Sequence, residues 1–387
     1  MSVSFPSRAG PDAPPPDARR AYLDRRYFLS LNGLRFLCIA AVMWHHAPAN
    51  ALVDGVRILD RGFVGVDFFF VLSGFLITTL LLREERRDGR ISLAGFYRRR
   101  ALRILPVYLL LVTVMSAYWV GVKGQQDLVG LVPYYYAFLA NFLKGDIPLL
   151  SITWSLSVEE QYYLIWPALL VLLPALVRLR AGLLAVLIGI CLLAMLGLAE
   201  WLGLPRLETR HAVFVLPGMS YMAILCGSLT ALLLDDRAGF RLLWRLCGWR
   251  GAPLAWFAAL ALYLQLAPES LLGWPALGMD VLMALCLASL VVREDHVLRP
   301  VMTLAPVARV GEISYGLYLY HLIGLHIASE GLRVAGLAGP GAQWAATLVY
   351  PLVSMVLAEA SFRWFESFFL SLKSHGGSGR EKPAPNP

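Results

Sequence analysis

The chain has 387 residues, of which 58% are hydrophobic and only 16% are charged, and its net charge is +8. Soluble domains are nearer half apolar and a quarter charged, so this composition argues against a soluble multidomain protein. The positive charge does not indicate nucleic-acid binding, because the basic residues lie at the ends of apolar runs, where membrane topology requires them.

Apolar runs of about 20 residues, the length that crosses a hydrocarbon core, recur along the chain. They predict an all-α fold, a polytopic membrane bundle of about ten transmembrane helices. In chain order we expect the spans near residues 29–48, 63–82, 102–121, 154–177, 182–202, 212–234, 253–268, 273–292, 310–329 and 343–368.

The stretch 127–153 is the ambiguous part of this pattern. Its apolar part, Leu131 to Leu143, is short for a full crossing. If the stretch is re-entrant or interfacial on the outer side, most arginines fall on the cytoplasmic side, as the positive-inside rule expects. A full crossing would invert everything after it and put the cluster from Arg237 to Arg250 outside. We therefore expect no crossing here, and both termini in the cytoplasm.

The two ends of the chain differ in composition from the middle. Residues 1–26 are rich in Pro, Ala and Arg and predict a disordered cytoplasmic arm, and 372–387 predict a disordered tail. Residues 27–371 then form the membrane domain. The five cysteines show no CxxC spacing, so neither a metal site nor a disulfide framework is predicted.

The first span carries an arginine and a histidine, although a charge inside a bilayer costs about 2.5–3.5 kcal/mol. Arg35 and His46 are eleven residues apart, almost three helical turns, so they share one face about 16 Å apart along the axis. The adjacent His45 faces another direction. The plainer alternative is that Arg35 snorkels to the inner interface and His46 caps the helix before Pro48.

The second span begins near its outer end with an acid, Asp67. The short connection to the first span makes the two helices neighbours. Asp67 can then accept a hydrogen bond from the His46 ring and fix its tautomer. Alternatively, Asp67 is solvated in the outer interface, and the residues alone leave both interpretations open.

The third and fourth spans both begin with charged groups. Arg100 and Arg103 are spaced i, i+3 and form a good phosphate clamp on the cytoplasmic side, unless they are ordinary positive-inside residues. Glu159 lies where a helix dipole favours acids, which is the simpler account. It shares a face with Tyr162 and Tyr163.

The ninth span stacks Ser314, Tyr318 and His321 at i, i+4 and i+7. His321 falls near mid-membrane. A buried histidine bonded to a neighbour is the simpler account of it.

Together these stretches resemble, in order, the motifs of the acyltransferase 3 family of bacterial membrane O-acyltransferases. The matching motifs are Arg35 with ten residues before His46, the Gly-Val-Asp to Ser-Gly-Phe signature within Phe63–Thr78, Arg100-x-x-Arg103 with Pro106, Trp154-Ser155 through Glu159, and Ser314-Tyr315 through His321. Residues 361–366 resemble the closing motif, without the proline that often follows its glutamate.

The resemblance implies transfer of an acyl group, usually acetyl, from acyl-CoA to a hydroxyl of a carbohydrate or small-molecule acceptor. The implied catalytic residues are His46, with Asp67 and Glu159 assisting. Arg35, Arg100 and Arg103 would bind acyl-CoA. The remaining candidates, at an acceptor or structural site, are Ser73, Trp154, Ser155, Tyr318 and His321.

The resemblance further implies a multi-pass protein of the bacterial inner membrane whose partners are acyl-CoA, the acceptor and the bilayer. It implies no bound cofactor and no nucleic acid. A proton-coupled transporter or flippase is the alternative, since intramembrane His, Asp and Glu also build proton relays. Against it, the sequence has no inverted repeat and no paired broken helices. A structural or sensory protein whose basic segment 83–103 binds anionic lipid is a third hypothesis.

Overall fold

The computed structural model of the chain describes residues 17–53, 55–173, 177–205, 207–214 and 219–372. Helices account for 78% of it, which confirms the all-α prediction. Two short strands, β1 (Leu207–Glu208) and β2 (Val213–Phe214), pair antiparallel.

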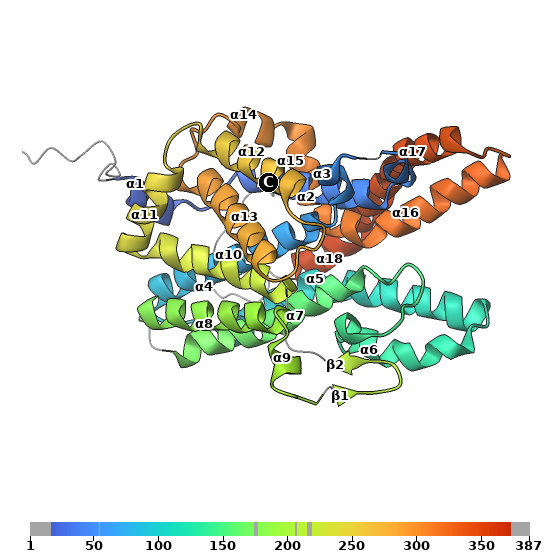
Figure 1. Ribbon diagram of the computed structural model, residues 1–387, viewed down its shortest axis with the longest axis horizontal. Coiled ribbons are helices and arrows are strands. Elements are labelled where there is room, and N and C mark those ends of the chain that lie inside the picture. Colours follow the sequence, from blue (N-terminus) through green and yellow to red (C-terminus); the bar gives the residue numbers. More distant parts are fainter. Residues whose placement is uncertain (1–16, 54, 174–176, 206, 215–218, 373–387) are drawn as a thin grey trace, which may run out of the picture.

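Ten long helices of the described residues form the body of the molecule, as Figure 1 shows in outline. They are α2 (Ser30–His46), α4 (Val64–Asp88), α5 (Leu93–Ser116), α7 (Thr153–Leu172), α8 (Val177–Met195), α10 (Met219–Asp235), α12 (Ala252–Leu266), α13 (Trp274–Val292), α16 (Ser314–Val334) and α17 (Pro340–Ser361). Each predicted span overlaps one of them. The number of crossings and the cytoplasmic location of the termini stay predictions.

Within the described parts of the chain, five helical segments are both long and apolar enough to cross a membrane. They are Val64–Asp88, Leu93–Val122, Arg178–Met195, Trp274–Val292 and Pro340–Ser371. Two shorter apolar helices, Ser220–Asp235 and Ala252–Leu266, accompany them. The chain is therefore a multi-pass membrane protein.

Short elements connect the long helices. They are α1 (Ala18–Asp24), η1 (Pro48–Leu52), α3 (Arg57–Asp60), η2 (Ala117–Val122), η3 (Gln126–Leu131), α6 (Val132–Tyr136), η4 (Ala140–Phe142), α9 (Leu198–Trp201), α11 (Arg237–Cys247), α14 (Arg299–Met302), α15 (Ala305–Glu312), η5 (Phe362–Glu366) and α18 (Ser367–Ser371). The ambiguous stretch 127–153 contains only most of η3, α6, η4 and the first residue of α7, so it does not form one long helix.

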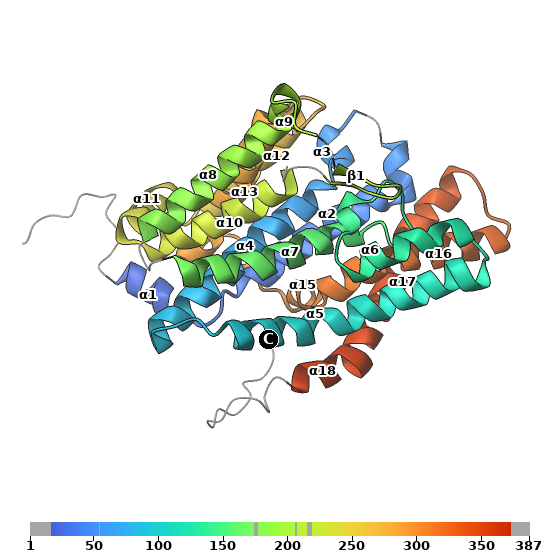
Figure 2. The same ribbon diagram turned by 90° about the horizontal axis from the view of Figure 1, so that it is seen from below.

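The helices α4, α7, α8 and α10 run side by side (Figure 2). The backbones of α4 and α10 touch because a glycine of each helix lies against a backbone carbonyl of the other. A Cβ at Gly227 would lie 1.9 Å from the Val71 carbonyl oxygen, and one at Gly74 would lie 1.9 Å from that of Ile224. Small residues allow this close approach between helices in a membrane.

α2 lies inside the bundle, in contact with α4, α13, α14, α15 and α16. Leu34, Cys38, Ile39 and Val42 are at most 2% exposed, so one side of the helix is packed against the core. This packing fixes the position of the two polar residues, Arg35 and His46, that α2 carries.

The predicted disordered arm over residues 1–26 is wrong for the part that the structure describes. Residues 18–24 form α1, and Tyr22 in it is only 2% exposed. Its ring lies 5.7 Å from that of Phe28 and 5.9 Å from that of Phe240, measured between centroids. One buried aromatic residue anchors a segment whose overall composition is polar. Residues 1–16 and 373–387, on which the rest of the two disorder predictions falls, lie outside the described residues.

Candidate functional site

Arg35 and His46 lie on one continuous helix, as the spacing predicted. α2 ends at His46 because Ala47 is extended and Pro48 begins a separate turn. At 1.5 Å per residue the two side chains start about 16 Å apart along the helix. The site therefore has two ends, one around each residue.

The histidine end is defined by the tautomer of His46. The Nδ1–H of His46 donates to the Val42 carbonyl oxygen at 2.9 Å. A carbonyl oxygen only accepts, so the lone pair of this half-buried imidazole is on Nε2. Nε2 has no hydrogen-bond partner among the described residues, which leaves it available as a base.

A second imidazole lies against the first. The ring centroids of His46 and His321 are 4.9 Å apart, edge to face. His321 is fully buried, and its Nδ1–H donates to the Tyr318 carbonyl oxygen at 2.7 Å. Its Nε2 has no partner within the described chain. Two acceptor nitrogens thus belong to adjacent rings.

Tyr318 continues this end of the site toward α7. Its ring centroid lies 5.7 Å from that of His321, and its hydroxyl is 2.7 Å from the Ser155 hydroxyl. The neighbouring Trp154 contacts the ring of Phe70 at 6.0 Å. A chain of contacts therefore runs from His46 through His321 and Tyr318 to Ser155, all predicted from the sequence, whereas the ring contact of Trp154 is with Phe70.

The other end of the site holds the three predicted arginines. Arg35 is close enough to Arg100 and Arg103 for their charges to repel. Arg35 Nη1 donates to Asn32 Oδ1 at 2.8 Å, and the Arg100 guanidinium lies 4.7 Å from the Tyr163 ring centroid. This cluster is named the arginine end below.

These three arginines have no ion pair among the described residues, although several other arginines do. Within the described residues, no carboxylate oxygen lies within 4.0 Å of a guanidinium nitrogen of Arg35, Arg100 or Arg103. Other arginines do have such partners: Arg86 pairs with Asp235, Arg99 with Glu84, and Arg180 with Glu85. Three converging guanidiniums without a carboxylate partner are suited to bind an anion.

Glu159 belongs to the arginine end. The Ser73 hydroxyl donates to Glu159 Oε1, and the Tyr163 hydroxyl donates to Ser73 Oγ at 3.0 Å. Glu159 also interacts electrostatically with Arg100 and Arg103. A hydrogen-bonded row from α4 and α7 therefore lines the cluster, and Ser73 and Glu159 lie together on it.

Asp67 does not hydrogen-bond to His46, whose Nδ1 is already bonded to Val42. The alternative of a solvated acid does not fit either, since Asp67 is only 4% exposed. Its charge instead acts on Asp280 of α13, which is fully buried with neither carboxylate oxygen bonded. Sequence reasoning missed Asp280, although one acid within the apolar run 274–292 is a usable signal.

The closing motif divides between the site and the surface. Glu366 is 9% exposed, accepts a hydrogen bond from Ser361 at 3.1 Å and interacts electrostatically with Arg103. Glu359 instead pairs with Arg309 at 2.8 Å and with Arg363 at 2.6 Å. The first is part of the arginine end, and the second is a surface ion network.

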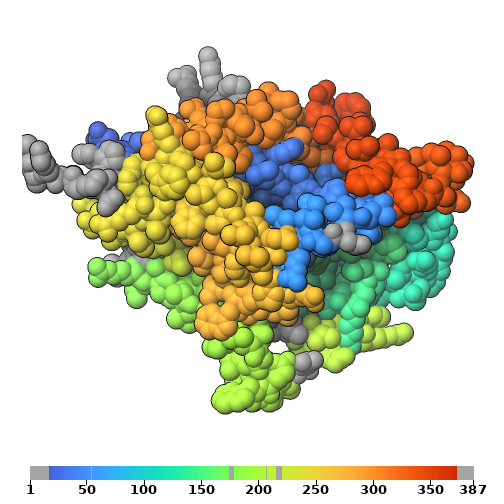
Figure 3. Space-filling model, turned by 45° about the horizontal axis from the view of Figure 1, so that its top comes forward, coloured from blue at the N-terminus to red at the C-terminus, as the bar shows by residue number. Residues whose placement is uncertain are grey.

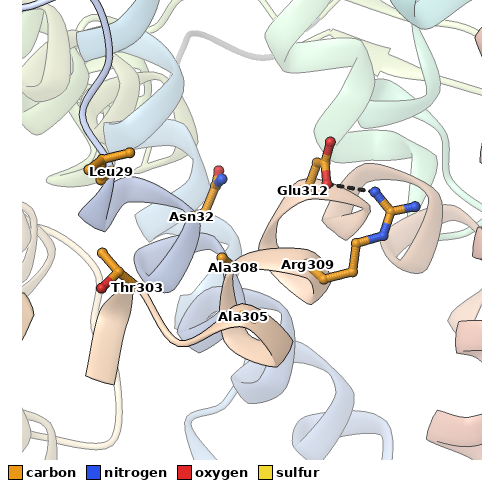
Figure 4. Close-up of a pocket in the computed structure, with 7 residues that line it drawn as sticks. All are labelled: Leu29, Asn32, Thr303, Ala305, Ala308, Arg309 and Glu312. Carbon is orange, nitrogen blue, oxygen red and sulfur yellow. Dashed lines mark hydrogen bonds and ion pairs between the residues drawn. The ribbon is translucent and has the colours of Figure 1, made fainter. Parts of the chain in front are cut away.

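A pocket of about 260 Å³ opens beside the arginine end (Figure 4). It is lined by Leu29, Asn32, Thr303, Ala305, Ala308, Arg309 and Glu312. Asn32 lines this pocket and also contacts Arg35, because its Oδ1 accepts the hydrogen bond from the guanidinium. The pocket therefore lies next to the unpaired arginines.

Taken together, the fold and the site define a class of protein. It is an α-helical membrane protein in which one helix, α2, carries an imidazole with a free Nε2 at one end and joins a cluster of unpaired arginines at the other, within the part of the chain that the structure describes.

Comparison with known protein families identifies the family of this chain. The profile of the acyltransferase 3 family, described as an acyltransferase domain, matches residues 28–359. The chain therefore belongs to the acyltransferase 3 family, whose members transfer acyl groups.

Curated relatives resemble part of the chain. The peptidoglycan O-acetyltransferase OatA of Listeria monocytogenes serovar 1/2a is 33% identical over 190 residues, which are 46% of this chain and 29% of that protein. A putative O-acetyltransferase of Staphylococcus aureus strain COL is 34% identical over 165 residues, covering 39% and 26%. The O-acetyltransferase OatA of Staphylococcus aureus strain NCTC 8325 is 33% identical over 160 residues, covering 38% and 25%.

Each of these matches covers less than a third of the relative's own length. No solved structure matches the chain.

Proposed function

We propose that the protein moves an acetyl group from acetyl-CoA to a hydroxyl of a carbohydrate acceptor, with His46 as general base. The observation that carries this proposal is the unbonded Nε2 of His46 on the same helix as the unpaired arginine cluster. One end of α2 suits the phosphates of a CoA thioester. The other end suits removal of a proton from a hydroxyl.

The donor side of the proposal rests on charge. CoA carries several phosphate groups, and Arg35, Arg100 and Arg103 converge without a carboxylate partner among the described residues. Guanidinium groups bind phosphate oxygens with strong, charge-assisted hydrogen bonds. The flexible pantetheine arm would then extend along α2 and bring the thioester toward His46, about 16 Å away.

The reaction balances with the groups present. His46 Nε2 takes the proton of the acceptor hydroxyl as its oxygen attacks the thioester carbonyl carbon. A C–O ester bond forms and the C–S bond breaks. The CoA thiolate leaves and receives the proton that His46 took up, so the imidazole returns to its neutral state. Direct transfer of this kind needs no covalent acyl-enzyme.

The acceptor side would be formed by the histidine end. The lone pair on His321 Nε2 is buried without a donor, which costs about 1–3 kcal/mol. A second hydroxyl of a sugar acceptor would supply that donor, while the Tyr318 and Ser155 hydroxyls orient the ring. The acid Glu159 would act from the arginine end, by holding Ser73 and Tyr163 in position.

The class of acceptor is suggested by the relatives. One of them is named a peptidoglycan O-acetyltransferase, so we propose a cell-envelope glycan as acceptor. We further propose the bacterial inner membrane as the location, with acyl-CoA bound from the cytoplasmic side. The comparisons do not favour a transporter or flippase.

Mass spectrometry of envelope glycans tests this proposal. Cells that make the protein should contain glycan sugars carrying an additional 42 Da acetyl ester, removable by mild base. Cells that make Arg100→Ala, Arg103→Ala protein at equal membrane abundance should contain less of it. Unchanged glycans in cells with the wild-type protein would contradict the proposed acceptor class. Purified protein that releases no CoA from acetyl-CoA in the presence of those glycans would contradict the donor.

A further inference from the structure

α11 is a short helix with three distinct sides. It covers residues 237–247, and its first turn is fixed by Asp236, whose carboxylate accepts from the backbone N–H of Ala238 at 2.8 Å and of Gly239 at 3.0 Å. The acid nearest in sequence to the helix is thus engaged in capping.

One side of α11 is packed against the protein. Phe240 and Cys247 are fully buried, and Leu243 is 6% exposed. The ring of Phe240 lies 5.9 Å from those of Tyr22 in α1 and Trp244. α11 and α1 lie together at one end of the molecule (Figure 1). The orientation of the helix about its axis is therefore fixed.

The second side carries only arginines. Arg237, Arg241 and Arg245 are spaced i, i+4 and i+8, so they form one exposed row. None of the three makes an ion pair or a side-chain hydrogen bond with any residue that the structure describes. Several exposed arginines elsewhere do make such contacts: Arg20 pairs with Asp24, Arg87 with Asp88, and Arg250 with Asp295.

The third side is apolar and equally open. Leu242 is 52% exposed and Leu246 is 41% exposed, and Trp249 directly after the helix is 50% exposed. In the space-filling view (Figure 3), the yellow region that includes α11 lies on the outside of the molecule. Large apolar side chains beside unpaired arginines indicate a partner that is apolar on one side and anionic on the other.

The neighbours of α11 identify that partner as a membrane surface. α11 connects α10 to α12, two apolar helices of the bundle, so it lies where both of them reach the same face of the bilayer. The positive-inside pattern puts this face on the cytoplasmic side, where anionic lipids attract basic segments.

We propose that α11 is an interfacial helix that binds anionic phospholipid. Arg237, Arg241 and Arg245 hold the phosphates of the headgroups, and Leu242, Leu246 and Trp249 lie among the upper parts of the acyl chains. The lipid thereby ties the α10–α12 connection, and α1 packed on it, to the membrane surface. This lipid site is separate from the arginine end and does not depend on the proposed function.

Native mass spectrometry of the full chain in detergent, titrated with phosphatidylglycerol or phosphatidylcholine, tests the proposal. The wild-type protein should bind phosphatidylglycerol at least tenfold more tightly than phosphatidylcholine. Arg237→Gln, Arg241→Gln, Arg245→Gln protein should lose most of this preference. The matched control is Arg20→Gln, Arg87→Gln, Arg250→Gln, which removes the same charge from ion-paired arginines and should keep the preference.

Two further measurements apply even if the triple variant folds poorly. The preference of the wild-type protein should fall as salt is raised, since the contacts are between exposed charges. Soluble glycerol phosphate should not compete, because it lacks the acyl chains. Equal binding of both lipids by the wild-type protein, or a salt-independent preference, would overturn the proposal. So would a triple variant that folds and binds like the wild type, or full competition by glycerol phosphate.

Discussion

His46 and His45 are adjacent in sequence, yet their chemistry differs because of one backbone contact. The Val42 carbonyl one turn earlier holds His46 Nδ1 as a donor. His45 Nδ1 is buried without a partner in the described chain, and its ring packs on Phe63 at 5.5 Å between centroids. Helical spacing from Arg35 selected His46, but it carried no information about the tautomer.

Substitutions at the arginine end should weaken the binding of acetyl-CoA without weakening the binding of the acceptor. Arg100→Ala with Arg103→Ala should raise the KM for acetyl-CoA about tenfold or more, because each lost charge-assisted contact weakens phosphate binding by about 1.5–3 kcal/mol. The KM for the glycan acceptor should change little.

Steady-state kinetics of purified protein in lipid nanodiscs measures both values. Arg98→Ala with Arg99→Ala is the matched control from the preceding turn of α5, since Arg99 is already paired with Glu84. An equal rise in both KM values would speak against a donor role for the arginine end.

His296, in the connection after α13, makes the stability of the folded protein depend on pH. It is 3% exposed, and its Nε2 shares a hydrogen bond of 3.0 Å with the Ser30 hydroxyl. Burial, with the charges of Arg299, Arg25 and Arg293 assisting, lowers the pKa of His296 to about 4. The unfolded chain binds a proton below about pH 6.5 and the folded protein does not, so acid favours unfolding.

The free energy of unfolding should therefore fall by about 2 kcal/mol between pH 7 and pH 5 on account of His296. Thermal unfolding in detergent at a series of pH values measures this. His296→Gln keeps an acceptor but does not titrate, so its stability should change less over the same range. Identical pH profiles for the two proteins would contradict this account of the buried imidazole.

At the scale of elements, the α4–α10 contact depends on two glycines. Gly227→Ala should destabilise the protein by about 1–3 kcal/mol, because the new Cβ would meet the Val71 carbonyl oxygen at 1.9 Å. Gly189→Ala in α8 is the control, since nothing lies within 4 Å of its Cβ position, and alanine there should favour the helix. Thermal unfolding of both variants checks this prediction, and equal stability of the two would show that the backbones move apart freely.

At the scale of the whole molecule, apolar run length predicted where the helices lie, and the structure has a long helix in every predicted range. Residue composition failed at α1, because one side chain, Tyr22, decides its order by packing on Phe240. Residue composition also could not assign a partner to Asp67. The neighbour of Asp67 is Asp280, more than 200 residues later in the chain, and such long-range pairs are set by how helices pack.

Some parts of the site were predictable from the sequence and others were not. Motif spacing paired Arg100 with Arg103 and Tyr318 with His321, because the members of each pair lie within one turn of each other. That Arg35 and His46 join these pairs depends on how α2 packs against the other helices. The separation of Glu159 from His46 was not predictable, since the placement of α7 relative to α2 is set by the tertiary packing. The lack of ion pairs at Arg35, Arg100 and Arg103 is likewise a property of the folded bundle.

The central claim is that His46 removes the acceptor proton during acyl transfer. Its most direct test is the rate of CoA release and acetyl-ester formation from acetyl-CoA by purified His46→Ala protein, beside His45→Ala protein as control. We predict a loss of at least a hundredfold in kcat for His46→Ala, with nearly wild-type turnover for His45→Ala. Equal turnover by the His46→Ala and wild-type proteins would contradict the account.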